Sequence, residues 1–272
     1  MSARIHSSVA VAIASIALLA GTASASAAQR DKPKATVVLV HGAWTDSSSW
    51  AAVVRRLQRT GHMVAAPGNP LRGLASDAAY LRSYLGTIDG PVVLAGHSYG
   101  GAVITNAAAG NANVKALVYA NAYLPDEGED VVHLTGARPG SALGGDPAAV
   151  FDFAPYPGAP AGDLELYIKP RVFTRAFAND LSRPVGRALA ASQRAVALGA
   201  LTERSGPPAW KTIPSWSVVG TVDRVIPVAQ QNAMSQRAGS RITQLQAGHL
   251  SPISRSRVVA RVIARAVRRT GP

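Results

Sequence analysis

The chain has 272 residues, 47% of them hydrophobic, and 28 Lys and Arg against 15 Asp and Glu give it a formal net charge of +13. That length suits one domain with a sizeable core. Cysteine is absent, which excludes disulfides, cysteine nucleophiles and thiolate metal sites, and the few histidines show no metal-ligand spacing.

The N-terminal segment has the layout of a secretory signal peptide. Arg4 supplies a positive charge, an apolar run follows at 9–20, and small residues fill 23–28. The apolar run is too short to span a bilayer comfortably. We therefore expect a signal peptide at 1–28, cleaved after Ala27 or Ala28, and a secreted or cell-envelope protein whose single domain is 29–272.

Short apolar runs alternate with helical patterns along most of the remaining chain. The alternation predicts an α/β fold, a mostly parallel sheet flanked by helices on both faces. The predicted strands are 35–40, 63–66, 91–95, 115–120, 215–219 and 241–245. The predicted helices are 48–59, 76–85, 99–109, 228–237 and 256–269.

A G-x-S-x-G motif at 96–100 joins the third predicted strand to the third predicted helix. A serine on such a sharp strand-to-helix turn presents its hydroxyl outside the sheet, and its flanking glycines let strand and helix approach closely. The N-terminus of the helix adds free N–H groups and a positive dipole end. This context predicts that Ser98 is a nucleophile.

The βα pattern is interrupted between Leu124 and Trp210, where prolines and glycines gather, and eight of the fifteen acidic residues fall between Asp126 and Glu165. We interpret 124–210 as an irregular inserted cap that sets specificity, with helical pieces at 163–167 and 184–201. Six aromatic residues of the cap are candidates to line a substrate pocket or, equally, to pack the cap on the body: Phe151, Phe153, Tyr156, Tyr167, Phe173 and Phe177.

A serine nucleophile needs a base, and the base needs an orienting carboxylate. His249 follows the last predicted strand and is the expected base; His133, at the start of the cap, is the other histidine after Ser98. Asp223 follows the preceding strand and is the only carboxylate between Glu203 and His249. Asp223 is therefore the expected acid, and Asp126 is the fallback.

An oxyanion hole requires two backbone donors aimed at the developing charge. The turn around Ser98 supplies the N–H of Tyr99, and the loop after the first strand supplies that of Ala43. We expect His41 and His97 to be buried histidines that bind neighbouring loops and take no part in catalysis.

The last predicted helix carries arginines at helical spacing on one face and valines and isoleucine on the other. This predicts a solvated basic face and leaves open a weak contact with anionic envelope surfaces. No aromatic residues interleave with the arginines, so no nucleic-acid partner is expected.

Four segments together resemble the α/β-hydrolase superfamily: 39–44, 96–101, 223–227 and 248–249. More narrowly they are similar to the serine-esterase branch that holds plant methylesterases, hydroxynitrile lyases and their bacterial relatives. The resemblance implies a triad of Ser98, Asp223 and His249 with an oxyanion hole at Ala43 and Tyr99. The lyases carry threonine and lysine where this chain has Gly42 and Leu250, which favours the esterases. The superfamily's dehalogenases and epoxide hydrolases use aspartate where Ser98 stands.

The sequence thus predicts a secreted serine hydrolase that cleaves esters or lactones of small, largely apolar acids through an acyl-enzyme, without cofactor or metal. Another reaction at the same triad remains open: amide hydrolysis, perhydrolysis or carbon–carbon cleavage. The alternative from a different class is a non-catalytic protein that holds a small ligand in the same pocket.

Overall fold

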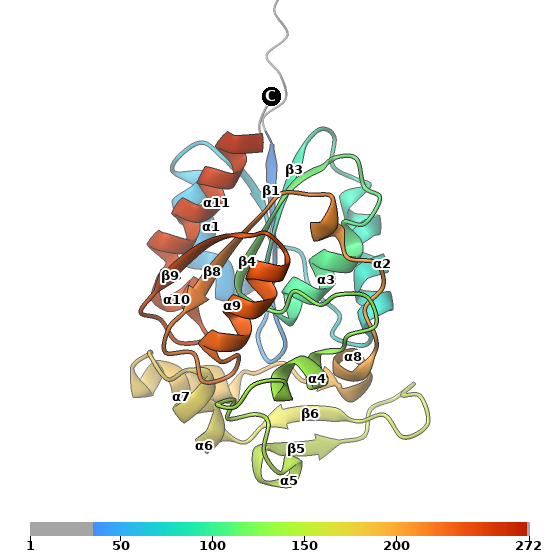
Figure 1. The fold of residues 1–272 in the computed structure, drawn as a ribbon. Coiled ribbons are helices and arrows are strands. Elements are labelled where there is room, and N and C mark those ends of the chain that lie inside the picture. The colour runs from blue at the N-terminus through green and yellow to red at the C-terminus, as the bar shows by residue number, and fades with distance from the viewer. Residues whose placement is uncertain (1–34, 271–272) are drawn as a thin grey trace, which may run out of the picture. The chain divides into compact units, whose positions relative to one another are not determined.

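The fold is built on a six-stranded parallel sheet, in the order β2-β1-β3-β4-β8-β9 (Figure 1). A computed structural model describes residues 35–270, so the expected signal peptide lies outside the described residues. All six predicted strands are confirmed. Their bounds are β1 Thr36–Val40, β2 Met63–Ala65, β3 Val92–Ser98, β4 Val114–Ala122, β8 Ser215–Gly220 and β9 Arg241–Leu245.

Helices cover both faces of the sheet because alternate residues of a strand point to opposite faces. In β1, Val37 and Leu39 share a buried cluster with α1 and α11, whereas Val38 and Val40 share one with α2, α3 and α9. No helix within 35–270 is both long and apolar enough to cross a membrane. The bounds are η1 Ser47–Trp50, α1 Ala51–Gln58, α2 Leu74–Leu85, α3 Tyr99–Ala107, α9 Val228–Arg237, α10 Ser251–Ser254 and α11 Ser256–Thr270.

The inserted segment between β4 and β8 lies at the carboxyl ends of the parallel strands (Figure 1). It is more regular than the sequence predicts, because β5, β6 and β7 form an antiparallel sheet of their own. Its elements are α4 Val131–Gly136, α5 Pro147–Val150, β5 Phe151–Ala154, β6 Glu165–Ile168, α6 Pro170–Val172, η2 Phe173–Phe177, α7 Arg183–Ala191, β7 Val196–Ala197, α8 Leu198–Thr202 and η3 Ala209–Lys211.

Two helical expectations in this cap need correction. The helix expected at 163–167 is wrong, because β6 occupies most of that stretch and buries Leu166 and Ile168 on one face with period two. The helix expected at 184–201 is right in part: α7 ends at Ala191, and β7 and α8 follow.

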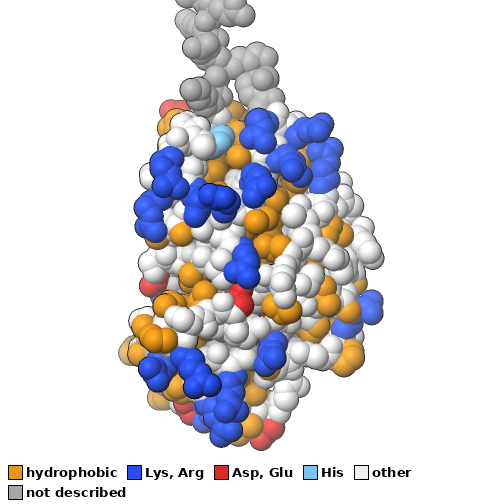
Figure 2. Space-filling model, turned by 90° about the vertical axis from the view of Figure 1, so that its left-hand side faces the viewer, with side chains coloured by type: hydrophobic (Ala, Val, Ile, Leu, Met, Phe, Trp, Pro, Cys, Tyr) orange, Lys and Arg blue, Asp and Glu red, His pale blue; other side chains and the backbone are white. Residues whose placement is uncertain are grey.

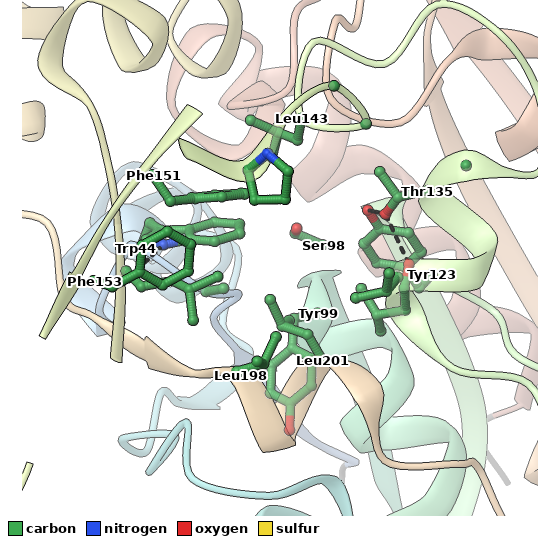
Figure 3. Close-up of a pocket in the computed structure, with 18 residues that line it drawn as sticks. Trp44, Ser98, Tyr99, Tyr123, Thr135, Leu143, Phe151, Phe153, Leu198 and Leu201 are labelled. Carbon is green, nitrogen blue, oxygen red and sulfur yellow. Dashed lines mark hydrogen bonds between the residues drawn. The ribbon is translucent and has the colours of Figure 1, made fainter. Parts of the chain in front are cut away.

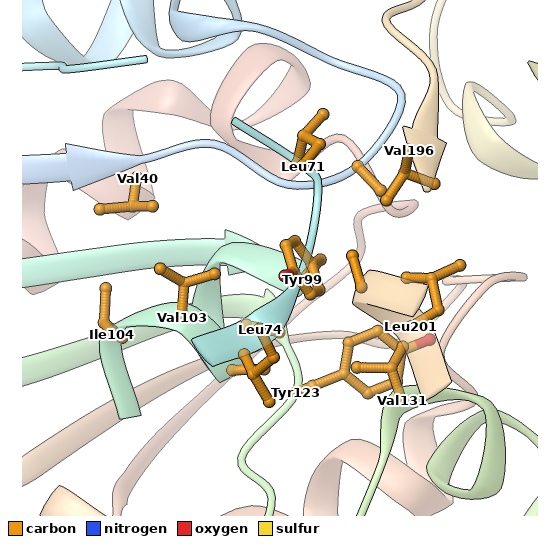
Figure 4. Packing of buried hydrophobic residues seen from close by; sticks show 14 of the residues in the cluster. Val40, Leu71, Leu74, Tyr99, Val103, Ile104, Tyr123, Val131, Val196 and Leu201 are labelled. Carbon is orange, nitrogen blue, oxygen red and sulfur yellow. The ribbon is translucent and has the colours of Figure 1, made fainter. Parts of the chain in front are cut away.

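Hydrogen bonds and apolar packing hold the cap to the body. The indole N–H of Trp210 donates to the carbonyl of Pro125 at 2.9 Å, which joins the two ends of the cap. Apolar side chains from the cap and the body also share one buried cluster (Figure 4). The labelled members of that cluster from the cap are Val131, Val196 and Leu201, and they lie around Tyr99, Tyr123, Leu71 and Leu74 of the body.

Candidate active site

Ser98 ends β3 with a strained backbone, φ 53° and ψ −125°, and α3 begins at the next residue. The turn is tight enough to require glycine on both sides. A Cβ on Gly100 would lie 2.4 Å from the carbonyl oxygen of Val40, and one on Gly96 would lie 2.5 Å from that of Gly100. The G-x-S-x-G pattern therefore reflects close packing around a serine whose strained turn points its hydroxyl out of the sheet.

A line of hydrogen bonds runs from this serine through His249 to Asp223. His249 Nε2 lies 2.9 Å from Ser98 Oγ, and its Nδ1 lies 3.0 Å from Asp223 Oδ2. The three residues come from the loops or ends of β3, β8 and β9, which meet at one edge of the sheet. With its proton on Nδ1, facing the carboxylate, the imidazole leaves Nε2 free to accept the serine proton.

The Asp223 carboxylate is buried and receives five donors, none of which, in the described part of the chain, is a lysine or arginine. Its Oδ1 accepts the backbone N–H groups of Val225 and Ile226 at 2.8 and 3.1 Å. Its Oδ2 accepts Asn121 Nδ2 at 2.8 Å, Gln231 Nε2 at 2.9 Å and His249 Nδ1. Arg224, its sequence neighbour, donates instead to the carbonyl of Arg175. The donors fix the carboxylate in one orientation toward the histidine.

Sequence reasoning missed Asn121, which links the acid loop to the histidine loop. Its Nδ2 donates both to Asp223 and, at 3.1 Å, to the carbonyl of Gly248. It is fully buried, has φ +46°, and sits where the pairing of β3 with β4 skips one residue. Such a β-bulge re-aims a side chain. The available signal was a polar residue at the carboxyl end of a predicted apolar strand.

The other two expected histidines are buried and bind loops. His97 Nε2 donates to the carbonyl of His249 at 3.0 Å, and His41 Nε2 accepts the N–H of Asn69 at 2.9 Å. Desolvation lowers the pKa of His97 well below its usual value, aided by nearby His249, and desolvation also lowers the pKa of His41. Both rings therefore stay neutral, and His97 anchors the backbone of the residue expected to act as base.

Asp126, the fallback acid, and His133, the other histidine after Ser98, do not join this constellation. The Asp126 carboxylate pairs with Lys211 at 2.7 Å. His133 is exposed on α4, and its backbone N–H donates a hydrogen bond to the carboxylate of Asp130. Nor do residues 35–270 contain a group of three or more His, Asp or Glu arranged to hold a metal ion.

A cavity of about 470 Å³ opens beside Ser98, between the sheet edge and the cap. Figure 3 shows Ser98 between Trp44, Phe151 and Phe153 on one side and Tyr123 and Thr135 on the other. Ala43 and Tyr99, the expected oxyanion donors, also line it. No charged residue is among its lining residues, and its volume suits a small organic molecule.

The few polar groups of the lining are mostly engaged elsewhere. Tyr99 Oη donates to Asp77 at 2.8 Å, and Trp44 Nε1 donates to the carbonyl of Leu166 at 2.9 Å. Burial raises the pKa of Tyr123, so its hydroxyl stays protonated and pairs with Thr135 Oγ1 at 2.7 Å. A molecule in this cavity therefore meets apolar surface almost everywhere except at Ser98.

The six cap aromatics proposed for the pocket fall into three pairs. Phe151 and Phe153 line the cavity. Phe173 and Phe177 are buried and do not line it, and the centroid of the Phe177 ring lies 4.8 Å from that of His249. Tyr156 and Tyr167 lie outside the cavity, bound to Asp163 and Glu165. The cavity also recruits apolar residues that the sequence did not single out: Tyr123, Val131, Val132, Leu143, Leu166, Leu198 and Leu201.

Comparison with known proteins points to one family. The model of the alpha/beta hydrolase family matches residues 37–262. A carbendazim hydrolyzing esterase from Nocardioides sp. (strain SG-4G) is 34% identical over 113 residues, which are 37% of this chain and 47% of that protein. The aligned part thus spans about half the length of this curated relative.

Solved structures share the fold over most of the chain. Polyneuridine aldehyde esterase superposes with a TM-score of 0.71 at 18% identity, over 86% of this chain and 99% of its own. An extracellular alpha/beta-hydrolase from a Paenibacillus species gives 0.70 at 20% identity, over 85% and 98%. At this level of identity the likeness concerns the fold.

Proposed function

Because the chain belongs to the alpha/beta hydrolase family, we propose that it is a serine hydrolase that cleaves uncharged carboxylic esters or lactones of small, largely apolar acids. One observation carries the proposal: hydrogen bonds run from Ser98 through His249 to Asp223, and the serine faces an apolar cavity. The partial likeness to a named esterase supports the same class of reaction.

In the acylation step, Ser98 Oγ attacks the carbonyl carbon of the ester while His249 Nε2 takes the hydroxyl proton. The carbonyl oxygen becomes an oxyanion, which the backbone N–H groups of Ala43 and Tyr99 stabilise. The bond to the leaving oxygen then breaks, and His249 returns the proton to that oxygen. An alcohol departs, and the acid remains bound as an ester of Ser98.

Water completes the cycle by the same route. His249 Nε2 takes a proton from a water molecule as its oxygen attacks the acyl carbon. The second oxyanion occupies the same backbone donors, the bond to Ser98 Oγ breaks, and the histidine proton passes back to the serine. Asp223 stays ionised throughout and stabilises the transient imidazolium.

The cavity defines the class of substrate through its lack of charge. A carboxylate or ammonium group would lose its hydration on entering and find no counter-ion among the lining residues. Uncharged esters with an aryl or branched alkyl group fit both its volume and its aromatic wall of Trp44, Phe151 and Phe153.

The test combines covalent labelling with turnover. A fluorophosphonate should form one adduct, located by mass spectrometry on the peptide that contains Ser98, and p-nitrophenyl esters of rising chain length should be hydrolysed. Ser98→Ala should abolish labelling and lower kcat by about 10³- to 10⁶-fold. An adduct elsewhere in the folded protein, or none, contradicts the proposal.

The same experiment separates the alternatives. A protein that labels at Ser98 yet turns over amides or peracids faster than esters performs another reaction at the same residues. A protein that binds small apolar ligands but neither labels nor turns over any substrate is a binding protein.

We also propose that the protein is exported, since residues 1–28 have a signal-peptide pattern and one relative of the same fold is extracellular. N-terminal sequencing of protein from the culture medium or cell envelope should begin at Ala28 or Gln29. An intact Met1 in cytosolic protein contradicts export.

A further inference from the structure

A second hollow, of about 530 Å³, lies between α1 and α11 and shares no lining residue with the cavity at Ser98. Its lining has no acidic residue, and four of its members have no ionisable side chain: Leu57, Thr60, Ala260 and Ala264. The others are His62 and five arginines. We call this hollow the arginine groove, after those five residues: Arg56, Arg59, Arg257, Arg261 and Arg268.

Within residues 35–270 the arginines of this groove have no acidic partner. None of the five ion pairs formed there includes one of these five arginines. Arg56 donates to Ser256 Oγ at 3.1 Å, whereas Arg257, Arg261 and Arg268 are exposed. Lys and Arg side chains gather on this side of the molecule, and acidic side chains are sparse there (Figure 2).

Such crowding opposes folding, since like charges four residues apart on a helix repel. Arg257, Arg261 and Arg265 form two such pairs along α11. A role in solubility alone would not explain why arginines of α1 and α11 face the same groove. An external anion that lies between the helices would relieve the repulsion.

We propose that the arginine groove binds a linear polyanion made of phosphate or phosphodiester groups that carries no bases. Guanidinium groups bind phosphate oxygens in a bidentate fork. Arg257 and Arg268 are 11 residues apart on one helix, about 16 Å along its axis, so the groove spans several phosphates in a row.

The lining disfavours two other anionic partners. No Phe, Tyr or Trp lines the groove, and single-stranded nucleic acids gain much of their affinity by stacking bases on such rings. A flat bilayer surface would contact the rims of the hollow and leave its floor empty. Because the groove and the Ser98 cavity have no residue in common, the chain can hold a polyanion while that cavity stays open.

The test measures binding of fluorescently labelled inorganic polyphosphate by anisotropy, with two matched charge-reversal variants. Arg257→Glu/Arg261→Glu alters the groove, and Arg183→Glu/Arg187→Glu makes the same charge change at the same spacing on exposed positions of α7. The groove variant should bind at least about tenfold more weakly and show a shallower salt dependence, since fewer counterions are released. The α7 variant should stay within about twofold of the wild type.

Equal binding by the groove variant and the α7 variant overturns the proposal. So does tighter binding of oligothymidylate than of polyphosphate, or binding of phosphatidylglycerol vesicles without binding of polyphosphate. Ester turnover and Tm verify that both variants are folded. If the charge reversal unfolds the chain, Arg257→Gln/Arg261→Gln repeats the measurement with the same expected direction.

Discussion

The Asp223 carboxylate holds the proton of His249 on Nδ1, across 3.0 Å. In Asp223→Asn, one carboxylate oxygen becomes an amide NH₂ group. When that group faces Nδ1 it donates instead of accepting, and it favours the imidazole tautomer with the proton on Nε2. We expect kcat to fall by about 10⁴-fold, with KM for a p-nitrophenyl ester unchanged. Asp126→Asn is the control, because Asp126 pairs with Lys211. Near-normal turnover of Asp223→Asn with loss in the control would assign the acid to Asp126.

Asn121 orients the same carboxylate through its side-chain amide, and two substitutions separate that role from its unusual backbone. Asn121→Ala removes the amide and strains φ, whereas Asn121→Gly removes the amide and suits φ +46°. Both variants should lose about 10- to 100-fold in kcat through misplaced acid and base. The glycine variant should be more stable than the alanine variant by about 1 kcal/mol.

Steady-state kinetics and thermal unfolding of the two Asn121 variants check this expectation. Full turnover in Asn121→Gly would mean that the residue serves only the backbone conformation. The hydrogen bonds to Asp223 and Gly248 would then have no effect on the reaction.

The three residues of the expected triad could be inferred from the sequence because each comes shortly after a recognisable strand. Ser98, Asp223 and His249 stand after buried apolar runs whose carboxyl ends share one edge. The sequence places polar Asn121 at the end of a predicted apolar strand, but the orientation of its side chain could not be predicted. That orientation depends on one skipped pairing between β3 and β4, which arises from the register of two strands.

The strands and helices of the body were predictable, whereas the short elements of the cap were not. The strand at 241–245 and the helix at 228–237 match their predicted bounds, because each has a clear pattern and a clear end. By contrast, β7 has two residues and β6 has four. A four-residue strand and a single helical turn each bury only one or two side chains, so their hydrophobic patterns look alike. Pairing with a neighbouring strand in the folded protein then determines which of the two forms.

The cap should control acyl preference through the aromatic side chains that reach the cavity. Phe151→Ala removes a ring whose centroid lies 5.6 Å from that of Trp44, and so enlarges the cavity at its aromatic wall. The ratio of kcat/KM for long over short acyl esters should rise by about tenfold or more, since each added methylene gains apolar contact. Fluorophosphonate labelling of Ser98 should persist.

Tyr156→Ala is the matched control, because this cap aromatic lies outside the cavity, with Arg72 over its ring. It should leave the chain-length profile unchanged. If Phe151→Ala and Tyr156→Ala altered the profile equally, or if labelling declined only in step with stability, the cap would be a structural cover.

At the scale of the whole molecule, two neutral histidines make stability depend on pH. Burial lowers the pKa of His97 and of His41 in the folded state, whereas the unfolded chain titrates near 6.5. Below that pH the unfolded state binds more protons, so stability is lost as the pH falls. The loss is at most about 1.4 kcal/mol per pH unit for each histidine that stays neutral.

Urea unfolding at pH 7, 6 and 5 measures this slope. His97→Gln should reduce it, and His133→Gln, which alters an exposed histidine on α4, should not. A free energy of unfolding that is constant from pH 7 to 5 would mean that the unfolded chain gains no protons relative to the native state.

The hydrogen bond from Trp210 to Pro125 bears on how the cap can change during evolution. The 124–210 segment leaves the body and returns to it at one point, so its length and sequence can change without altering the order of the strands that carry Ser98, Asp223 and His249. Under the proposed role of the cap, a relative with the same body would change its substrate by altering one contiguous stretch of coding sequence. The evolution of the body and that of the cap can then be traced separately, by comparing their sequences one at a time.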